Sequence, residues 1–167
     1  MKLAVGDMVV YGGHGIGRVA ARDQDVVLDT SREVVVLELA DGLVVTLPLD
    51  RAREQLRPLA SEADMTRIQE TLREDRALTG DPWLSRRRET LAKLTRGDPV
   101  LLAEIVGDGS QRERTLRASG TKPQLSSGER EVFVKAWKLL SGEIAVARGI
   151  EQSEADGWID EQLARTT

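Results

Sequence analysis

The sequence predicts an α+β protein in which a small N-terminal β-barrel, formed by a bent antiparallel sheet, precedes a compact all-α domain of about five helices. Residues 5–58 contain short runs of valine and leucine separated by turn residues, which is typical of β-strands. After Pro58 the spacing of apolar residues changes from about two to about 3.6, the period of an α-helix. We therefore expect two domains, which cover residues 1–58 and 59–167.

Four strands are expected in the first domain, over Met8 to Tyr11, Gly15 to Arg22, Glu33 to Leu39, and Leu43 to Leu47. The last two flank Asp41-Gly42, a dipeptide that supplies the positive φ angles of a type I′ hairpin turn. Pro48 ends the fourth strand because proline has no amide hydrogen to donate, and it places that strand near a margin of the sheet. One sheet edge is therefore expected to be open to a partner.

Capping residues mark where the first three helices of the second domain begin. Ser61 and Asp64 form an N-cap pair, and the apolar face that follows them consists of Met65, Ile68 and Leu72. Two further helices are expected after Asp-Pro pairs, in which a capping acid precedes a proline at the first helical position. These pairs are Asp81-Pro82 and Asp98-Pro99.

A long helix and a final helix complete the second domain. The stretch from Gly107 to Ser127 is rich in Gly, Ser, Thr and Arg, so its middle is expected to be a loop. Ser126 to Glu129 has the S-x-x-E form of a capping box and opens a helix that Gly149 ends. The last helix is expected over Glu151 to Arg165. The apolar stripe of the long helix is Phe133, Ala136, Trp137, Leu140 and Ile144.

The composition excludes several kinds of site. The chain has no cysteine and one histidine, which excludes disulfides, thiolate zinc sites and His-rich metal sites. It has no run of about 18 apolar residues, and its first residues meet acid and glycine too early for a signal peptide. We expect a cytoplasmic monomer that needs no cofactor and does not contact a membrane.

Neither a nucleotide site nor a catalytic centre is predicted. The glycine-rich segment from Gly12 to Gly17 matches no phosphate-loop pattern and precedes a strand, whereas such loops need a helix N-terminus. We interpret it as a turn between twisted strands, with His14 as a turn residue. The carboxylates are spread at ordinary surface spacing, so the protein is not expected to be an enzyme.

Positive charge is concentrated in one segment of an acidic chain. The net charge is -4, but residues 82–96 carry five cations against one anion. A local patch of this kind binds DNA only weakly in the free protein, so it calls for a second anchor. The cations are Arg86, Arg87, Arg88, Lys93 and Arg96.

Trp83 is the residue that suggests a contact with nucleic acid. On a helical wheel its indole lies on the border between two faces of the helix. One is a leucine face with Leu84, Leu91 and Leu94, and the other is a basic face that holds Arg86 and Lys93. Such a residue is either an amphipathic packing residue or a functional contact, and geometry leaves both interpretations open. Trp137, centred on the stripe of the long helix, and Trp158 are interpreted as packing residues.

The run of three arginines has a simple alternative interpretation, because charge runs on helices are usually solvated faces. Arg87 and Arg88 flank the leucine arc, where their aliphatic stems are expected to be buried, so Arg86 is expected to be the most available for a phosphate. Arg130 lies at the start of the long helix, where unpaired amides and the helix dipole favour anions. It is a second candidate phosphate contact.

A series of motifs runs through both halves of the chain. It consists of V-G-D-M-V-V-Y from Val5, His14-Gly15, Leu47-Pro48, Trp83 with its arginines, Leu91 to Leu94, Gly97-Asp98, Ser126 to Glu129 and Gly142-Glu143. In order and spacing, the chain resembles the CarD and CdnL transcription regulators. The first motif also opens the related domain of the transcription-repair coupling factor, so the helical half makes the resemblance specific.

The resemblance implies a function for each domain. The N-terminal part would be a Tudor-like domain that binds the β subunit of RNA polymerase, and the C-terminal part a helical domain that contacts promoter DNA. In the family, the tryptophan matching Trp83 wedges into the minor groove at the upstream edge of the melted region. Residues matching Arg86 and Arg88 touch the DNA backbone. The resemblance therefore implies a regulator that stabilises the open complex largely independently of sequence.

Two departures from the family pattern affect these expectations. Thr46 stands where some members have a basic residue, so the polymerase contact is expected to use either other side chains or strand addition at this edge. The expected edge consists of Leu43, Val44, Val45, Thr46, Leu47 and Pro48. The segment from Gly107 to Gln124 is longer than usual, and its cations are expected to be solvated or to reach DNA. They are Arg112, Arg114, Arg117 and Lys122.

Two other functions fit the sequence less well. One is a protein-only adaptor, in which the β domain binds polymerase or another protein and the helical domain recruits a further partner. The other is an RNA-binding module of translation. One tyrosine and one phenylalanine beside three tryptophans leave no platform on which bases would stack, which disfavours the RNA-binding module.

Overall fold

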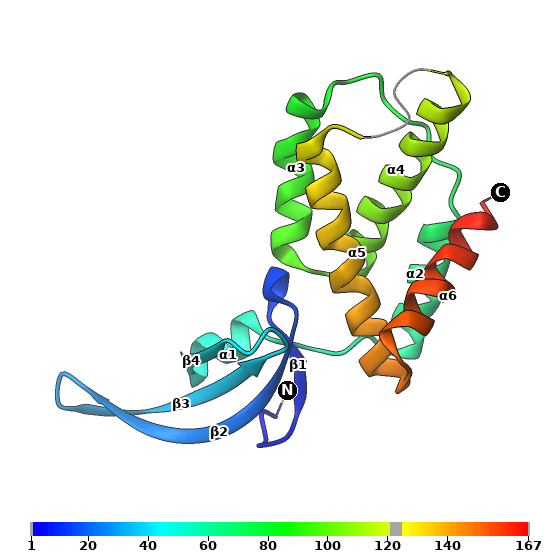
Figure 1. The fold of residues 1–167 in the computed structure, drawn as a ribbon. Coiled ribbons are helices and arrows are strands. Elements are labelled where there is room, and N and C mark those ends of the chain that lie inside the picture. Colours follow the sequence, from blue (N-terminus) through cyan, green and yellow to red (C-terminus); the bar gives the residue numbers. More distant parts are fainter. Residues whose placement is uncertain (1, 121–124, 167) are drawn as a thin grey trace. The chain divides into compact units, whose positions relative to one another are not determined.

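The structure is a computed structural model that describes residues 2–120 and 125–166. The chain divides into two compact units, Met1–Leu59 and Ala60–Thr167. We call them the β unit and the helical unit and describe each by itself (Figure 1). Within the described ranges, no helix is both long enough and apolar enough to cross a membrane.

The β unit is an antiparallel sheet of five strands in the order β4-β3-β2-β1-β5. The strands are β1 (Met8–Val10), β2 (Ile16–Val27), β3 (Thr30–Leu39), β4 (Val44–Pro48) and β5 (Arg57–Pro58). β2 and β3 form a long bent ribbon, and their register shifts between Val19 and Ala21, as at a β-bulge (Figure 1). The bent antiparallel sheet is confirmed, but the closed barrel is wrong, because the two-residue β5 pairs with β1 and does not reach β4.

The two long hairpins of the sheet have different turns. The β3–β4 hairpin is confirmed around Asp41-Gly42, where the Gly42 amide donates to the Leu39 carbonyl at 2.9 Å. Of the described loop residues only Gly42 has a positive φ, 89°, so the expected type I′ turn is wrong at this position. The positive φ pair occurs instead between β2 and β3, at Leu28 with 51° and Asp29 with 62°.

A short helix, α1 (Leu49–Gln55), follows β4 and was not predicted. Leu49, Ala52 and Leu56 have the i, i+3, i+7 spacing of an apolar helical face, which the preceding strand pattern obscured. Ala52 and Leu56 are buried, and α1 packs on β3 and β4. The core of the β unit also contains Leu3, Val9, Val19, Val35, Leu37 and Leu47.

Five helices form the described part of the helical unit, as expected, and the α+β fold class is confirmed. They are α2 (Glu62–Arg73), α3 (Trp83–Arg96), α4 (Pro99–Ala118), α5 (Ser127–Arg148) and α6 (Gln152–Ala164). Their shared core takes residues from every helix, among them Met65, Leu94, Leu102, Leu140 and Ile159. On α5 the expected stripe is confirmed: Ala136, Leu140 and Ile144 are fully buried, and Phe133 and Trp137 pack against them.

The caps of α2 and α4 agree with the sequence, that of α5 agrees in part because only Ser126 caps it, and that of α3 differs. Ser61 and Asp64 form a complete capping box at α2, and Asp98 caps α4 through two backbone amides. Pro82 occupies the N-cap position of α3, and no side chain caps this helix. The expected capping role of Asp81 is therefore wrong, because the extended Pro82 delays the helix by one residue and leaves Asp81 too early in the chain.

α4 continues to Ala118, so the loop expected in the middle of Gly107 to Ser127 is wrong for its first part. Gly107 and Gly109 suggested a loop, but both are buried within the helix. A Cβ at Gly109 would lie 2.3 Å from Cδ2 of Phe133, so this glycine permits close packing of α4 on α5. Lys122 and the rest of 121–124 lie outside the described residues.

Candidate functional site

Trp83 begins α3 and lies against the start of α5. Its side chain is partly buried and packs against the core of the helical unit. A Cβ on Gly128, the second residue of α5, would lie 3.1 Å from the indole Nε1, so glycine lets the ring approach this helix closely. The next residue, Leu84, is 81% exposed. The ring is therefore supported on one side, and an exposed apolar side chain adjoins it in the sequence.

A groove of about 670 Å³ adjoins Trp83, between α3 and the start of α5. Leu84 and Leu91 contribute apolar surface to it, and the exposed Arg87 and Lys135 contribute positive charge. Glu131 also lines it. We call this surface the Trp83 groove. An aromatic ring with apolar and basic neighbours is the combination that contacts bases and phosphates in nucleic-acid-binding proteins.

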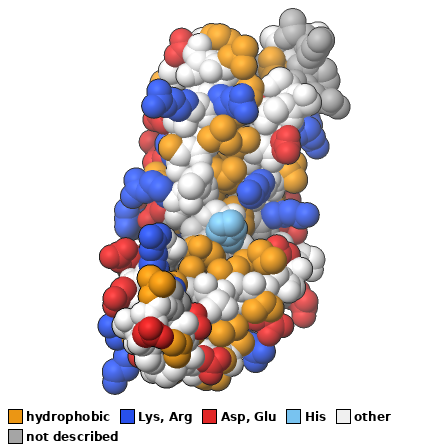
Figure 2. Space-filling view, turned by 90° about the vertical axis from the view of Figure 1, so that its left-hand side faces the viewer, with side chains coloured by type: hydrophobic (Ala, Val, Ile, Leu, Met, Phe, Trp, Pro, Cys, Tyr) orange, Lys and Arg blue, Asp and Glu red, His pale blue; other side chains and the backbone are white. Residues whose placement is uncertain are grey.

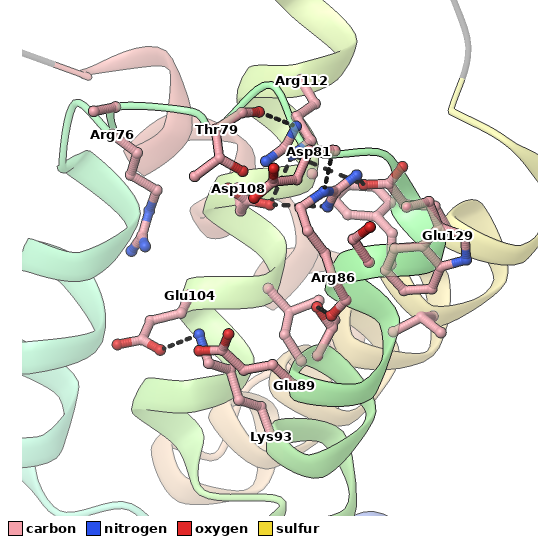
Figure 3. Close-up of a pocket in the computed structure, with 18 residues that line it drawn as sticks. Arg76, Thr79, Asp81, Arg86, Glu89, Lys93, Glu104, Asp108, Arg112 and Glu129 are labelled. Carbon is pink, nitrogen blue, oxygen red and sulfur yellow. Dashed lines mark hydrogen bonds and ion pairs between the residues drawn. The ribbon is translucent and has the colours of Figure 1, made fainter.

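Arg86 does not face solvent as expected, since its side chain is only 16% exposed. Nη2 lies 2.9 Å from Oε1 of Glu129, and Nη1 lies 3.8 Å from Oδ2 of Asp108. Nε donates to the carbonyl of Asp81 at 3.0 Å. Figure 3 shows the guanidinium of Arg86 directed toward these acceptors, which come from α4, α5 and the segment before α3.

The order of exposure among the three arginines is the reverse of the expected one. Arg87 and Arg88 are exposed, and so is Leu84, which the sequence placed on the leucine arc. Trp83 does lie between a surface lined by leucines and one lined by Arg86 and Lys93, as expected, but both cations pair with carboxylates of α4 and α5, and Arg86 is largely buried. Carboxylates on α4 and α5 make this burial possible, because they compensate a charge that is costly to bury alone.

Ion pairs with other helices also reduce the positive charge that residues 82–96 can offer to a ligand. Lys93 Nζ lies 3.1 Å from Oε2 of Glu104 on α4, so both Lys93 and Arg86 are paired with neighbouring helices. The three other arginines of the segment are exposed. On the face shown in Figure 2, basic side chains of the helical unit are interspersed with apolar ones and do not form a single patch.

The other candidate cations of the helical unit differ in how firmly they are paired. Arg130 is in the first turn of α5 with its side chain 54% exposed, and its Nη1 lies 3.1 Å from Oε1 of Glu113. Arg112, expected on a loop, belongs to α4 and lies 3.0 Å from Asp108 with its side chain 14% exposed. Arg130 therefore remains accessible to an anion, whereas Arg112 is engaged within the unit.

β4 is a margin of the sheet and pairs with β3. Its side chains alternate: Val44 and Thr46 are exposed, whereas Val45 is half-buried and Leu47 is buried. Pro48, the last residue, is half-buried. The core-facing residues anchor the strand, and the others leave its outer face accessible.

The hydrogen-bond pattern directs part of the β4 backbone outward. The Leu39 amide donates to the carbonyl of Leu43 at 2.8 Å, and in an antiparallel ladder hydrogen-bonded positions recur at every second residue. Val45 is the next such position in the register. The amides and carbonyls of Val44 and Thr46 therefore point away from β3, toward the margin.

Two family comparisons together cover most of the chain. Residues 3–60 match the CarD-like/TRCF RID domain, and residues 67–160 match the CarD C-terminal domain. The chain belongs to the CarD-like family of transcription regulators. It is also similar to a Bacillus subtilis (strain 168) protein named "Putative transcription factor YdeB", at 23% identity over 154 residues, which are 90% of this chain and 95% of that protein. The family resemblance expected from the sequence is confirmed.

The candidate site of this CarD-like protein also contains residues that the sequence did not predict there. Leu84 was placed on the buried arc, and Gly128 showed no signal because only its neighbour in space explains it. Glu129 was expected to cap its own helix, but its carboxylate pairs with Arg86. Among the described residues, no group of three or more His, Cys, Asp or Glu side chains could hold a metal ion.

Proposed function

We propose that this CarD-like protein binds the β subunit of RNA polymerase through the edge of β4 and promoter DNA through the Trp83 groove, and so stabilises the open complex. The observation that carries the proposal is the placement of Trp83. Its ring is supported by α5, while Leu84, Arg87 and Arg88 beside it in the sequence are exposed. We place the DNA contact at the upstream edge of the melted region.

A supported aromatic ring is suited to act as a wedge in DNA. Inserting an apolar group at a base step costs a few kcal/mol of stacking in duplex DNA, and it costs less where polymerase has already melted or distorted the helix. Trp83 then binds the open complex more tightly than the closed one. A difference of about 1.4 kcal/mol would shift this equilibrium about tenfold.

The exposed arginines are proposed to contact the DNA backbone. Arg87 and Arg88 lie on the first turns of α3 and are exposed. Arg130 is a further contact, because its side chain stays 54% exposed in the pair with Glu113 and an ion pair with one such exposed partner is weak. Backbone contacts position a protein without reading bases, which supports binding that is largely independent of sequence.

The edge of β4 is proposed as the polymerase contact. The outward amides and carbonyls of Val44 and Thr46 can pair with a strand added by the partner. Leu43 and Val44 are 54% and 60% exposed and add apolar surface to this edge. Main-chain pairing tolerates changes of side chain, which fits a threonine at position 46 where some family members have a basic residue.

Trp83→Ala tests the wedge directly. The variant should bind polymerase as the parent does but form promoter open complexes that decay faster, because the aromatic contact made only with opened DNA is lost. The measurement is the lifetime of open complexes after a competitor is added, with polymerase binding measured separately.

Trp158→Ala is the matched control, since Trp158 is also partly buried but lies on α6, where Arg148 stacks on it at 5.0 Å. Circular dichroism would verify that both variants are folded. A lifetime that stays at the parental value in Trp83→Ala, with folding intact, would remove the wedge assignment.

A protein-only adaptor is the second candidate, and the pairing of Arg86 and Lys93 favours it because it lowers the positive charge available to DNA. In that case the β unit binds polymerase and the helical unit recruits another protein. Crosslinking from positions 84 and 87 within a promoter complex decides between them. Crosslinks to DNA support the wedge, and crosslinks to protein alone support the adaptor.

A further inference from the structure

Four charged side chains join three helices next to Trp83 (Figure 3). Arg86 comes from α3, Asp108 and Arg112 from α4, and Glu129 from α5, so two positive charges meet two negative ones. Arg86 lies 2.9 Å from Glu129, and Arg112 lies 3.0 Å from Asp108. Arg112 also donates to the carbonyl of Thr79 at 3.2 Å. We call these four side chains the charge cluster.

Glu129 joins the charge cluster instead of completing a helix cap. It is the third residue of α5, where the S-x-x-E pattern would turn its carboxylate back to the amide of Ser126. Ser126 does cap the helix and accepts from the Glu129 amide at 3.5 Å, but the Glu129 carboxylate pairs with Arg86. Glu129 is 9% exposed, so its charge depends on the arginines of the cluster for compensation.

Arg86 also contacts the aromatic ring itself. Its guanidinium carbon lies 5.5 Å from the centre of the Trp83 ring, within the range of a cation–π interaction. Its Nε donates to the carbonyl of Asp81, just before α3 begins. One side chain therefore ties together the segment before α3, the ring of Trp83 and, through Glu129, the start of α5.

We propose that Arg86 is a positioning residue that holds Trp83 and the start of α3 against α5 through Glu129, and that it does not contact a DNA phosphate. This inference rests on the proposed role of Trp83, and it replaces the backbone contact that the family resemblance implies for Arg86. A phosphate that bound Arg86 would have to displace Glu129 from it. The nearly buried carboxylate of Glu129 would then lose part of its charge compensation while the carboxylate of Asp108 remained nearby. The exposed Arg87 meets a phosphate without that conflict.

Fluorine NMR of the free 167-residue chain, labelled with fluorotryptophan, tests the positioning role without DNA. Trp83→Phe identifies the Trp83 signal among the three tryptophans. Arg86→Gln should shift or broaden this signal and leave those of Trp137 and Trp158 in place, which also establishes that the unit is folded. Arg87→Gln is the control and should leave all three in place. An unmoved Trp83 signal in Arg86→Gln overturns the proposal.

The open-complex lifetime distinguishes positioning of Trp83 from phosphate binding by Arg86, because the two roles predict opposite changes in Glu129→Gln. If Arg86 positions Trp83, removing either partner harms the site, so Arg86→Gln and Glu129→Gln should both shorten the lifetime. If Arg86 binds phosphate, Glu129→Gln releases it from its partner and lengthens the lifetime. A longer lifetime in Glu129→Gln therefore overturns the proposal.

The salt dependence of the same lifetimes gives a readout that lost packing alone does not move. Each phosphate contact contributes about 0.9 to the slope of log affinity against log salt concentration on duplex DNA. Arg87→Gln should reduce the slope by about that amount, whereas Arg86→Gln should keep the parental slope. A reduced slope in Arg86→Gln would contradict the inference. If Trp83 does not act as a wedge, Trp83→Ala will have the same open-complex lifetime as the parent. The NMR result still decides independently whether Arg86 positions the ring.

Discussion

Leu84 is an exposed apolar residue whose position suggests a use. It is 81% exposed in the first turn of α3, whereas Leu91 and Leu94 of the same helix pack into the unit. An exposed leucine alone is ordinary on a protein surface. Next to a tryptophan that is proposed to enter the minor groove, it would be a second apolar side chain at the DNA, and leucine is among the residues that wedge between bases.

Leu84→Ala should shorten the open-complex lifetime by roughly fivefold, because partial burial of a leucine against DNA contributes about 1 kcal/mol. The free energy of unfolding should stay within about 0.5 kcal/mol of that of the parent, as is usual for substitution at an exposed site. Val134→Ala, a 41% exposed position on α5, is the control and should leave the lifetime unchanged. A parental lifetime in Leu84→Ala would restrict the apolar contact to Trp83.

At the scale of elements, the close approach of α4 and α5 provides the surface on which α3 packs. Gly109 on α4 lies so close to Phe133 on α5 that a Cβ would approach the ring to 2.3 Å. The charge cluster spans the same two helices. The position of Trp83 thus depends on the packing of two helices to which it does not itself belong.

Gly109→Ala should lower the free energy of unfolding by about 1–3 kcal/mol, because the added methyl group overpacks the interface. Gly142→Ala on α5 is the matched control, since a Cβ there would meet no atom within 4 Å. It should raise the free energy of unfolding by up to about 1 kcal/mol, the difference in helix propensity. Chemical denaturation measures both values. Equal effects in the two variants would contradict the packing argument.

The margin strand β4 allows a test that separates the outer edge from the sheet. Thr46→Pro should remove an outward amide and weaken binding to the polymerase β subunit while the sheet stays folded, because edge strands tolerate proline where the amide faces outward. Val45→Pro should instead remove an amide that faces β3 and destabilise the β unit. Binding assays and circular dichroism distinguish these outcomes. Unchanged polymerase binding in Thr46→Pro would exclude strand addition at this edge.

At the scale of the whole molecule, an acidic protein with a net charge of -4 carries only a few exposed cations near Trp83. Free DNA binding through so few phosphate contacts is weak and falls as salt rises. Binding of the β unit to polymerase would raise the effective concentration of the helical unit at the promoter, without any new DNA contact. We therefore propose that the DNA contact of the helical unit depends on prior binding of the β unit to polymerase.

The double variant Thr46→Pro with Trp83→Ala should give the same fraction of open complexes as Thr46→Pro alone. Once the polymerase contact is lost, Trp83 is seldom near the promoter, so its removal has little further effect. The measurement is the fraction of open complexes at a protein concentration that saturates the parent. Losses that add in the double variant would show that the DNA contact works without the polymerase contact.

The amino-acid sequence by itself determined the order of the four longer strands and of the five helices of the helical unit, but it missed α1 and β5. The capping residues Ser61 and Asp98, the terminating Gly149 and the apolar stripe of α5 were all predicted, because each depends on residues within one or two helical turns. The family followed from motifs spread over both units. The sequence also singled out Trp83 as a candidate contact, but it placed Arg86 in solvent and Leu84 on the buried arc.

Only the tertiary structure decided that the sheet stays open, that Gly109 packs against a ring, and that Arg86 is paired while Arg87 is exposed. These features depend on groups that are distant in the sequence. Whether a cation on α3 faces solvent is decided by the free energy of burying its charge, and this depends on carboxylates that α4 and α5 supply. A helical wheel of α3 does not include the carboxylates of α4 and α5, and so it placed Arg86 in solvent.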